Sequence, residues 1–254
     1  MTQHTFDFTG QTVIVTGGAT GIGRATALAF GRAGANVVIA SIGDGGTSVA
    51  DEVTAAGGHG LFVSTDVSRE DDVRRMVQTT VDTFGGLDVA FNNAGILPTT
   101  APLVEQTLDS WNRTIAVDLT GVFLSMKYEI EAMLAHGGGA IVNASSVAGL
   151  IADPGMSPYA AAKHGTIGLT KAAALDYAKQ GIRVNAIAPG LVRTPMIEGW
   201  MDDEVMRETV LAYSPQGRVS EPEEIAALVM FLGSDLSPFI NGAVFPIDGG
   251  QTAH

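Results

Sequence analysis

Tyr159 and Lys163 carry side chains suited to moving a proton to or from an oxygen. Residues four apart on a helix share one face. A free tyrosine has a pKa of about 10, and an ammonium beside it favours the phenolate and lowers that pKa. The hydroxyl of Ser146, upstream in the sequence, would hold an alcohol or carbonyl oxygen at the phenol. The three residues together predict acid–base chemistry at a C–OH or C=O group.

A glycine-rich turn near the start of the chain predicts a phosphate site. Residues 11–16 form a short run rich in β-branched residues, which is typical of a buried strand, and residues 21–33 are expected to form a helix. Gly17, Gly21 and Gly23 lie at this junction. Glycine lets the backbone turn sharply and approach a ligand closely. The free N–H groups at a helix N-terminus favour an anion such as pyrophosphate.

Apolar runs and helical patterns alternate along the whole chain. Strands are expected at 11–16, 36–41, 60–64, 87–91, 139–144, 182–187 and 243–247, and helices at 21–33, 46–56, 69–84, 107–135, 157–179 and 221–232. This alternation predicts one α/β domain over residues 1–254, with a doubly wound parallel sheet of about seven strands and helices on both faces. Ligands bind such sheets at the carboxyl ends of the strands. The stretch at about 190–215 interrupts the alternation, and we expect it to be an irregular, mobile substrate lid.

The order of several motifs resembles the short-chain dehydrogenase/reductase family, in its roughly 250-residue branch. These motifs are Thr16-Gly17-x-x-x-Gly21-x-Gly23, Asn92-Asn93-Ala94-Gly95, Ser146, Tyr159-x-x-x-Lys163, Pro189-Gly190 followed by Thr194, and Asp248-Gly249-Gly250. The resemblance extends from about residue 8 to residue 251. It implies a Rossmann-type fold and NAD(P)-dependent hydride transfer between a secondary alcohol and a ketone.

The resemblance also implies a role for each site residue. Tyr159 would be the general acid and base, Lys163 would bind the nicotinamide ribose, and Ser146 would orient the reacting oxygen. The spacing to Tyr159 favours Ser146 over its neighbour Ser145. The cofactor contacts would be Tyr159, Lys163, Gly17, Thr20, Gly21, Ile22, Gly23, Ser41, Asp66, Val67, Asn92, Asn93, Ala94, Gly95, Pro189, Gly190, Val192 and Thr194.

One position departs from the family pattern. Asp118 stands where the family usually carries an asparagine that supports a water-linked proton relay. Only an amide offers an N–H donor, although a carboxylate still holds a water and helps to keep Lys163 charged. Three interpretations stay open: a tolerated substitution, an altered pH profile, and a chain that binds nucleotide without turnover.

The choice of cofactor depends on the end of the second predicted strand. An acidic residue there would bind the ribose 2′-OH of NAD, but this strand ends in Ser41. NADP binders of the family usually carry a basic residue where this chain has Ile42 or Thr20, and no lysine or arginine lies between Arg32 and Arg69. The sequence therefore predicts NAD, with NADP as the alternative.

Composition excludes several classes of partner and site. The net charge of −13 disfavours nucleic acid and anionic membranes. No run approaches the ~20 apolar residues of a membrane span, and the first residues lack the pattern of a signal peptide. The chain has no cysteine, its five histidines lack metal-ligand spacing, and it has no Gly-x-Ser-x-Gly elbow. We expect a cytoplasmic protein without a metal that acts on a small molecule.

The predicted substrate is an apolar or cyclic alcohol or ketone. The apolar segments expected to cover it contribute Leu97, Met156, Met196 and Trp200. A 3-oxoacyl-thioester reductase is an alternative, which would require NADPH and a basic docking patch, and a non-catalytic nucleotide sensor is another. The segment at 248–250 and the helix around 160–174 resemble family contact surfaces, which implies a homotetramer.

Overall fold

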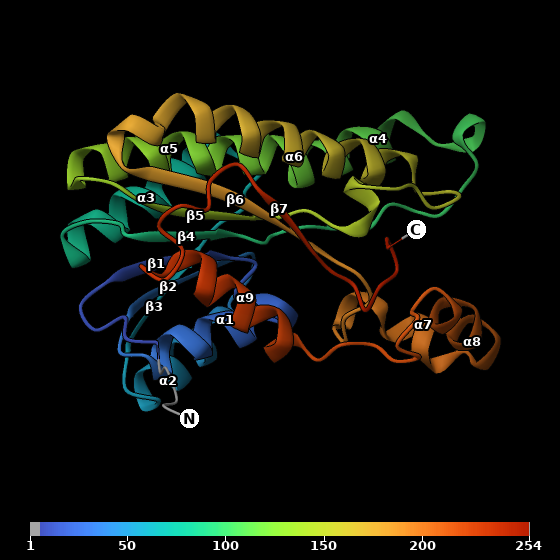
Figure 1. Cartoon of the computed structure of the whole chain (residues 1–254), viewed down its shortest axis with the longest axis horizontal. Helices are drawn as coiled ribbons and strands as arrows, with labels where there is room; N and C mark the ends of the chain where they lie inside the picture. Colours follow the sequence, from blue (N-terminus) through green and yellow to red (C-terminus); the bar gives the residue numbers. More distant parts are fainter. Residues whose placement is uncertain (1–5, 254) are drawn as a thin grey trace.

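The computed structural model describes residues 6–253 and contains one parallel sheet between two layers of helices (Figure 1). Its strands are β1 (Thr12–Thr16), β2 (Asn36–Ser41), β3 (His59–Ser64), β4 (Val89–Asn92), β5 (Gly139–Ala144), β6 (Ile182–Pro189) and β7 (Val244–Ile247). Their order is β3-β2-β1-β4-β5-β6-β7, and all neighbouring strands run parallel. The predicted doubly wound α/β fold with seven strands is confirmed.

The helices divide between the two faces of the sheet. The principal ones are α1 (Gly21–Arg32), α2 (Gly46–Ala55), α3 (Glu70–Phe84), α4 (Leu108–Ile115), α5 (Gly121–His136), α6 (Ser157–Tyr177) and α9 (Pro222–Gly233). Helices α1, α2 and α9 cover one face, and α3, α4, α5 and α6 lie on the other (Figure 1). In residues 6–253, no helix is long and apolar enough to cross a bilayer.

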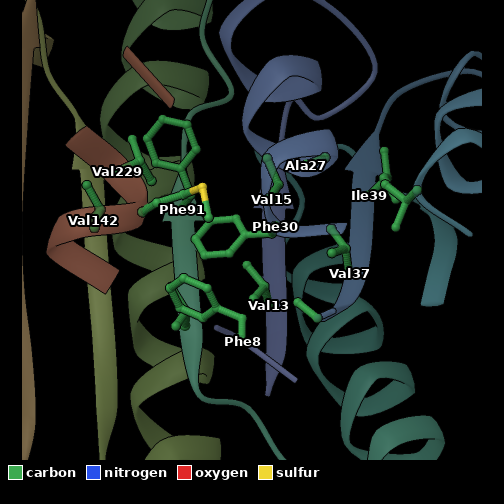
Figure 2. Close-up of a cluster of buried hydrophobic side chains, with 14 of the residues drawn as sticks. Phe8, Val13, Val15, Ala27, Phe30, Val37, Ile39, Phe91, Val142 and Val229 are labelled. Atoms are coloured by element: carbon green, nitrogen blue, oxygen red, sulfur yellow. The ribbon is translucent and has the colours of Figure 1, made fainter. Parts of the chain in front are cut away.

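Each face of the sheet has its own hydrophobic core. Successive side chains of a strand point to opposite faces, so Val13 and Val15 of β1 pack on one side and Ile14 on the other. In the first core Phe8 and Phe30 meet edge to face, with ring centres 4.7 Å apart (Figure 2). Both faces of β1 are buried, and this agrees with the nearly continuous run of apolar residues in its sequence.

The helix expected at 107–135 is interrupted by a wider turn. Helix α4 continues into a π-helical turn at Ala116–Thr120 and then into α5 without leaving the helical region. A π turn inserts one residue into the helical register, and such turns are frequent at functional sites. Here the turn contains Asp118.

The expectation that residues 190–215 are irregular is wrong. This stretch contains two short helices, α7 (Glu198–Asp202) and α8 (Glu204–Ala212), which lie together at one end of the molecule (Figure 1). The carboxylate of Asp203 caps α8 by accepting the N–H of Met206 at 2.7 Å. Pro195 begins a 3₁₀ helix at Pro195–Ile197, where its missing backbone N–H costs nothing.

Candidate active site

The candidate site lies where the strand order reverses, between β1 and β4. Open parallel sheets bind ligands in the crevice at this point. The hydroxyl oxygen of Thr16, the last residue of β1, accepts the N–H groups of Asn93 at 2.9 Å and Ala94 at 3.1 Å. The side-chain amide of Asn93 donates to the carbonyl oxygen of Thr16 at 3.0 Å. These bonds hold the two loops that leave β1 and β4 at a fixed separation.

The glycine turn after β1 approaches its neighbours too closely for side chains. A Cβ on Gly23 would lie 2.2 Å from the carbonyl oxygen of Gly17, and one on Gly17 would lie 2.9 Å from the amide nitrogen of Asn93. Gly21 begins α1 with a φ of 52°. No side chain caps α1 at Thr20, so the N–H groups of its first turn are available to a ligand. The turn therefore fits an anion such as the pyrophosphate of a dinucleotide.

A groove of about 540 Å³ runs along these loops. The predicted cofactor residues that line it are Gly17, Thr20, Gly21, Ile22, Ser41, Asp66, Val67, Asn93, Ala94, Gly95 and Thr194. Gly23, Tyr159, Lys163, Pro189, Gly190 and Val192 do not line it; Gly23 and Val192 are buried below. Its volume and the glycine turn in its lining together fit a dinucleotide.

Sequence reasoning missed eight residues that line the groove. They are Ile42, Thr65, Ser68, Ile96, Arg113, Ala116, Val117 and Pro195. Most of them are direct neighbours of predicted residues at the strand ends, so this adjacency is the signal that identifies them. Arg113, Ala116 and Val117 come from the helical segment just before Asp118. Ala116 and Val117 lie three and four residues after Arg113, so these three share one face of the helix, but helical spacing from Asp118 does not reach any of them.

Asn92 does not line the groove, contrary to the expectation. Its side-chain amide points into the interior, where it donates to Oε2 of Glu129 at 2.9 Å and to Oδ1 of Asn143 at 3.0 Å. Burial raises the pKa of Glu129 to about 8, although the hydrogen bond from Asn92 opposes this rise. Asn92 and Glu129 thus form a buried polar cluster behind the site.

Tyr159 and Lys163 lie in the first two turns of α6. The phenol of Tyr159 is half-buried, and the Lys163 ammonium lies 5.3 Å from the centre of its ring. Lys163 is buried, and its ammonium donates to the carbonyl oxygen of Ala144 at 3.0 Å. It also lies 3.3 Å from Oδ1 of Asp118. The spacing along α6 thus brings a phenol and an ammonium together, and the π turn adds the carboxylate of Asp118.

Asp118 is held from two sides. Both of its carboxylate oxygens lie 3.2 Å from the backbone N–H of Ile96. A Cβ on Gly95 would lie 2.6 Å from Oδ1 of Asp118, so only glycine allows this approach. The side chain is fully buried.

The two neighbouring serines have different surroundings. The hydroxyl of Ser145 is buried and donates to the backbone carbonyl of Lys163 at 3.0 Å. The hydroxyl of Ser146 is half-buried and accepts the N–H of Ala148 at 3.2 Å, which leaves its own proton for another partner. Ser146, the residue that the spacing favours, is therefore the one with a hydroxyl proton to offer.

Charges and burial shift the three titratable groups. Burial raises the pKa of the Tyr159 phenol; the Lys163 ammonium opposes this rise, the Asp118 carboxylate adds to it, and the Ser146 hydroxyl opposes it. Burial alone would lower the pKa of Lys163, but Asp118 and Tyr159 outweigh burial and hold that pKa above its usual value. Burial raises the pKa of Asp118 against the opposing pull of Lys163.

The four predicted substrate residues do not gather in the groove. Met196 lines it, whereas Met156 is buried and its sulfur accepts the hydroxyl of Thr100 at 3.8 Å. Leu97 and Trp200 are half-buried and lie outside the groove lining. Only Met196 thus lies beside the groove in this arrangement.

Comparisons with known proteins agree with this fold and order of motifs. The family model described as Enoyl-(Acyl carrier protein) reductase matches residues 9–252. The chain is 46% identical to 2,5-dichloro-2,5-cyclohexadiene-1,4-diol dehydrogenase of Sphingobium indicum, over 97% of this chain and 99% of that protein. It is 42% identical to cyclohexanol dehydrogenase of an Acinetobacter species, over 97% of this chain and 96% of that protein.

A solved structure extends the likeness to three dimensions. The crystal structure of levodione reductase matches with a TM-score of 0.93 at 39% identity, covering 97% of this chain and 99% of the other. The matches span the glycine turn, the Asn92–Gly95 segment and the Tyr159–Lys163 helix alike. On these grounds the chain belongs to the short-chain dehydrogenase/reductase family.

Proposed function

We propose that this protein is an NAD-dependent dehydrogenase that interconverts a secondary alcohol on an aliphatic ring and the corresponding ketone. The chain is an oxidoreductase of secondary alcohols and ketones. Its relatives that are named dehydrogenases and reductases belong to the same class. The observation that carries the proposal is the buried contact of Lys163 with Asp118, beside the half-buried Tyr159 phenol.

In this proposal the protein's own residues handle the proton. The Ser146 hydroxyl donates a hydrogen bond to the substrate oxygen and holds it at Tyr159. The Tyr159 phenolate accepts the alcohol proton as the C–H hydride departs, and in the reverse direction the phenol returns that proton to the ketone oxygen. The nicotinamide ring, when bound, accepts or supplies the hydride. Lys163 has three N–H donors and uses two on Ala144 and Asp118, which leaves one for a ribose hydroxyl.

The groove favours NAD over NADP. Ser41 and Ile42 line it at the end of β2, where neither offers a cation to a 2′-phosphate. Arg24, a cation close to the glycine turn, forms an ion pair with Glu52. Among the described residues that line the groove, Arg113 is the only cationic one, and it belongs to α4. A 2′-phosphate would thus have little compensating charge at the β2 end.

The segment at about 190–215 is proposed as the cover of the substrate. Thr194, Pro195 and Met196 line the groove, and α7 and α8 follow directly. Val192 pairs with Ser220, and Arg193 forms an ion pair with Glu221 at 2.9 Å, so the start of the segment is anchored to residues that follow its end. Exposed apolar side chains on the segment, such as Met196 and Met206, suit an apolar ring.

A homotetramer is proposed as the assembly. Large apolar side chains are exposed on α5, on α6 and in the loop before β7, notably Phe123, Leu175 and Phe239. Phe239 is fully exposed, and in the proposed assembly a neighbouring chain would cover it. Light scattering is expected to give the mass of four chains, and a monomer would contradict this assignment.

A screen of alcohols and ketones with both cofactors tests the proposed function. We expect cyclohexanol and its substituted forms to be oxidised with NAD, at higher kcat/KM than open-chain secondary alcohols. Tyr159→Phe should abolish turnover while NAD binding, measured by calorimetry, persists. Reduction of 3-oxoacyl thioesters with NADPH in preference to ring substrates would contradict the proposal, as would NAD binding without any turnover.

A further inference from the structure

The Asp118 carboxylate adds a fixed negative charge to the proton-handling residues. We propose that Asp118 sets the pH range in which Tyr159 exchanges its proton, because it cancels the positive charge of Lys163. Asp118 acts through Lys163, so it is a positioning residue for charge and does not itself touch the reacting atoms. This inference rests on the proposed function for its kinetic consequences, but not for its electrostatic ones.

The geometry holds the carboxylate against the ammonium. Asp118 is fully buried, Lys163 is 3% exposed, and their charged atoms lie 3.3 Å apart. The Ile96 N–H lies between the two carboxylate oxygens at 3.2 Å from each. The hydroxyl of Thr166 in α6 donates to the backbone carbonyl of Asp118 at 3.2 Å, which ties the π turn to the helix that carries Lys163. The carboxylate therefore cannot turn away from the ammonium.

The Asp118–Lys163 pair changes the electrostatic environment of the Tyr159 phenol. An isolated ammonium 5.3 Å from the ring would stabilise the phenolate strongly in a buried site. With Asp118 beside it, the ammonium belongs to a pair of zero net charge, and the opposite charge reduces its effect on the phenol. The groups that act on the phenol are Lys163 from its own helix, Asp118 from the π turn and the neutral Ser146 from the turn after β5. No other titratable group of residues 6–253 contributes to this balance.

Opposite effects on the two reaction directions follow. Alcohol oxidation needs the phenolate, so its rate rises as pH rises through the pKa of Tyr159. Ketone reduction needs the phenol, so its rate falls over the same range. A carboxylate that keeps the phenol protonated moves both limbs to higher pH. The site is therefore suited to oxidation in alkaline conditions, while reduction persists to high pH.

Asp118→Asn tests the charge while it keeps the shape of the side chain. Its amide oxygen still accepts the Ile96 N–H. We expect the acid limb of kcat/KM for alcohol oxidation and the alkaline limb for ketone reduction to move together to lower pH, by about one unit. On the acid limb, oxidation at fixed pH should rise roughly tenfold. A purely structural role would instead lower both rates without moving either limb, and that result would overturn the inference.

Glu129→Gln is the matched control. It replaces another fully buried carboxyl, in α5, outside the site and without a cationic partner among the described residues. Glutamine keeps one donor and one acceptor at that position. This variant should leave both limbs where they are in the wild type. A shift equal to that of Asp118→Asn would mean that any buried carboxyl has the effect, and would contradict the assignment to Asp118.

A measurement without turnover separates this inference from the proposed function. The phenol of Tyr159 is titrated by ultraviolet absorbance, as the difference between each protein and its Tyr159→Phe counterpart, with circular dichroism confirming that the fold persists. The phenol should titrate at lower pH in Asp118→Asn than in the wild type. If no alcohol is oxidised but this shift occurs, the proposed function fails and the inference stands. If alcohols are oxidised but the two titrations coincide, the inference fails alone.

Discussion

Two fully buried carboxyl groups, Asp118 and Glu129, lie on one continuous helical segment and have opposite surroundings. Asp118 faces the Lys163 ammonium at 3.3 Å and the backbone N–H of Ile96. Glu129 faces the side-chain amide of Asn92, and no cation among the described residues shifts its pKa. Equal burial thus accompanies a charged pair in one place and a lone acid in the other.

The contrast shows how a partner modifies the effect of burial: burial raises the pKa of both carboxyls, but only at Asp118 does a cation oppose that rise. Burial raises the pKa of Glu129 to about 8, so the group is mostly protonated at neutral pH. Oε1 of Glu129 and Oδ1 of Asn92 both lack a hydrogen-bond partner among the described residues. A proton on Glu129 turns one of its oxygens into a hydrogen-bond donor, which reduces the number of buried acceptors that lack a donor. Asp118 needs no proton, because Lys163 compensates its charge.

Removing the Lys163 ammonium should leave Asp118, like Glu129, as a buried carboxyl without a cationic partner. Lys163→Met leaves a buried carboxylate without its partner, which costs about 3–5 kcal/mol of unfolding free energy. Turnover should also be lost, since Lys163 is proposed to support both Tyr159 and the cofactor. Denaturant unfolding at pH 8 measures the loss of stability. The loss should shrink at pH 5, where the stranded carboxyl takes up a proton.

The double variant Lys163→Met with Asp118→Asn is the control for that loss. Without the carboxylate there is no stranded charge, so part of the stability should return, although turnover stays absent. Its stability should also depend less on pH than that of the single variant. A double variant no more stable than Lys163→Met would show that packing around Lys163, and not the ion pair, accounts for the loss.

Glu129 should make the protein less stable as pH rises. Burial raises the pKa of Glu129 in the folded protein to about 8, against 4.5 for the free side chain. Between these values the folded state holds a proton that the unfolded state has released. Its contribution is therefore present in full below pH 4.5 and is lost as pH rises towards 8, by about 1.4 kcal/mol per pH unit. Above that range both states have released the proton and the loss is complete.

Glu129→Gln isolates this contribution. The amide cannot ionise, so the variant should gain stability relative to the wild type with each step in pH between about 5 and 8. Unfolding midpoints in urea at a series of pH values measure the difference. Parallel curves for the two proteins would mean that Glu129 is charged throughout, and the contrast with Asp118 would disappear.

The fold could be predicted from the sequence because its signals are local. Short β-branched runs bounded by glycines mark the strands, and the predicted ends differ from the observed ones by at most two residues, as for β4 and β6. Two features lacked such a signal. The π turn at Ala116–Thr120 adds a residue to the register, which an apolar pattern of ordinary helical period does not record. Helix α8 begins at a cap by Asp203, which in the sequence resembles one more solvated carboxylate.

The site could be predicted only where spacing decides it. Tyr159 and Lys163 follow from one helical turn, and their ammonium–ring contact agrees with that. Asn92 and Asn93 are chemically identical neighbours, but their side chains point in opposite directions, to Glu129 and to Thr16. Glu129 lies between Lys127 and Glu131 like a surface charge. Its partners Asn92 and, through Asn92, Asn143 are distant in sequence, so only the folded chain reveals its burial.

Asn92→Ala tests how much the amide contributes to the Glu129 cluster. The change removes the donor to Glu129 and leaves Oδ1 of Asn143 without that bond. We expect a loss of about 1–3 kcal/mol of unfolding free energy, as for buried groups that lose a hydrogen bond. The pKa of Glu129 should rise further, because Asn92 is the group that lowers it. A stability equal to that of the wild type would mean that water replaces the amide.

An exposed carboxylate, Glu70, is the one expected to contribute least to stability and activity. Glu70, at the start of α3, accepts hydrogen bonds from Lys127 and Tyr128 of α5, each at 2.7 Å. These contacts are shorter than that between Lys163 and Asp118, and the Lys127 hydrogen bond lowers the pKa of Glu70. However, half of the Glu70 side chain is exposed, so water and salt screen its charge. Glu70→Gln should therefore leave the denaturation midpoint and kcat/KM unchanged within error, at both low and moderate salt. A loss of stability as large as that of Lys163→Met would mean that contact distance outweighs burial, because the shorter pair would then be worth as much as the buried one.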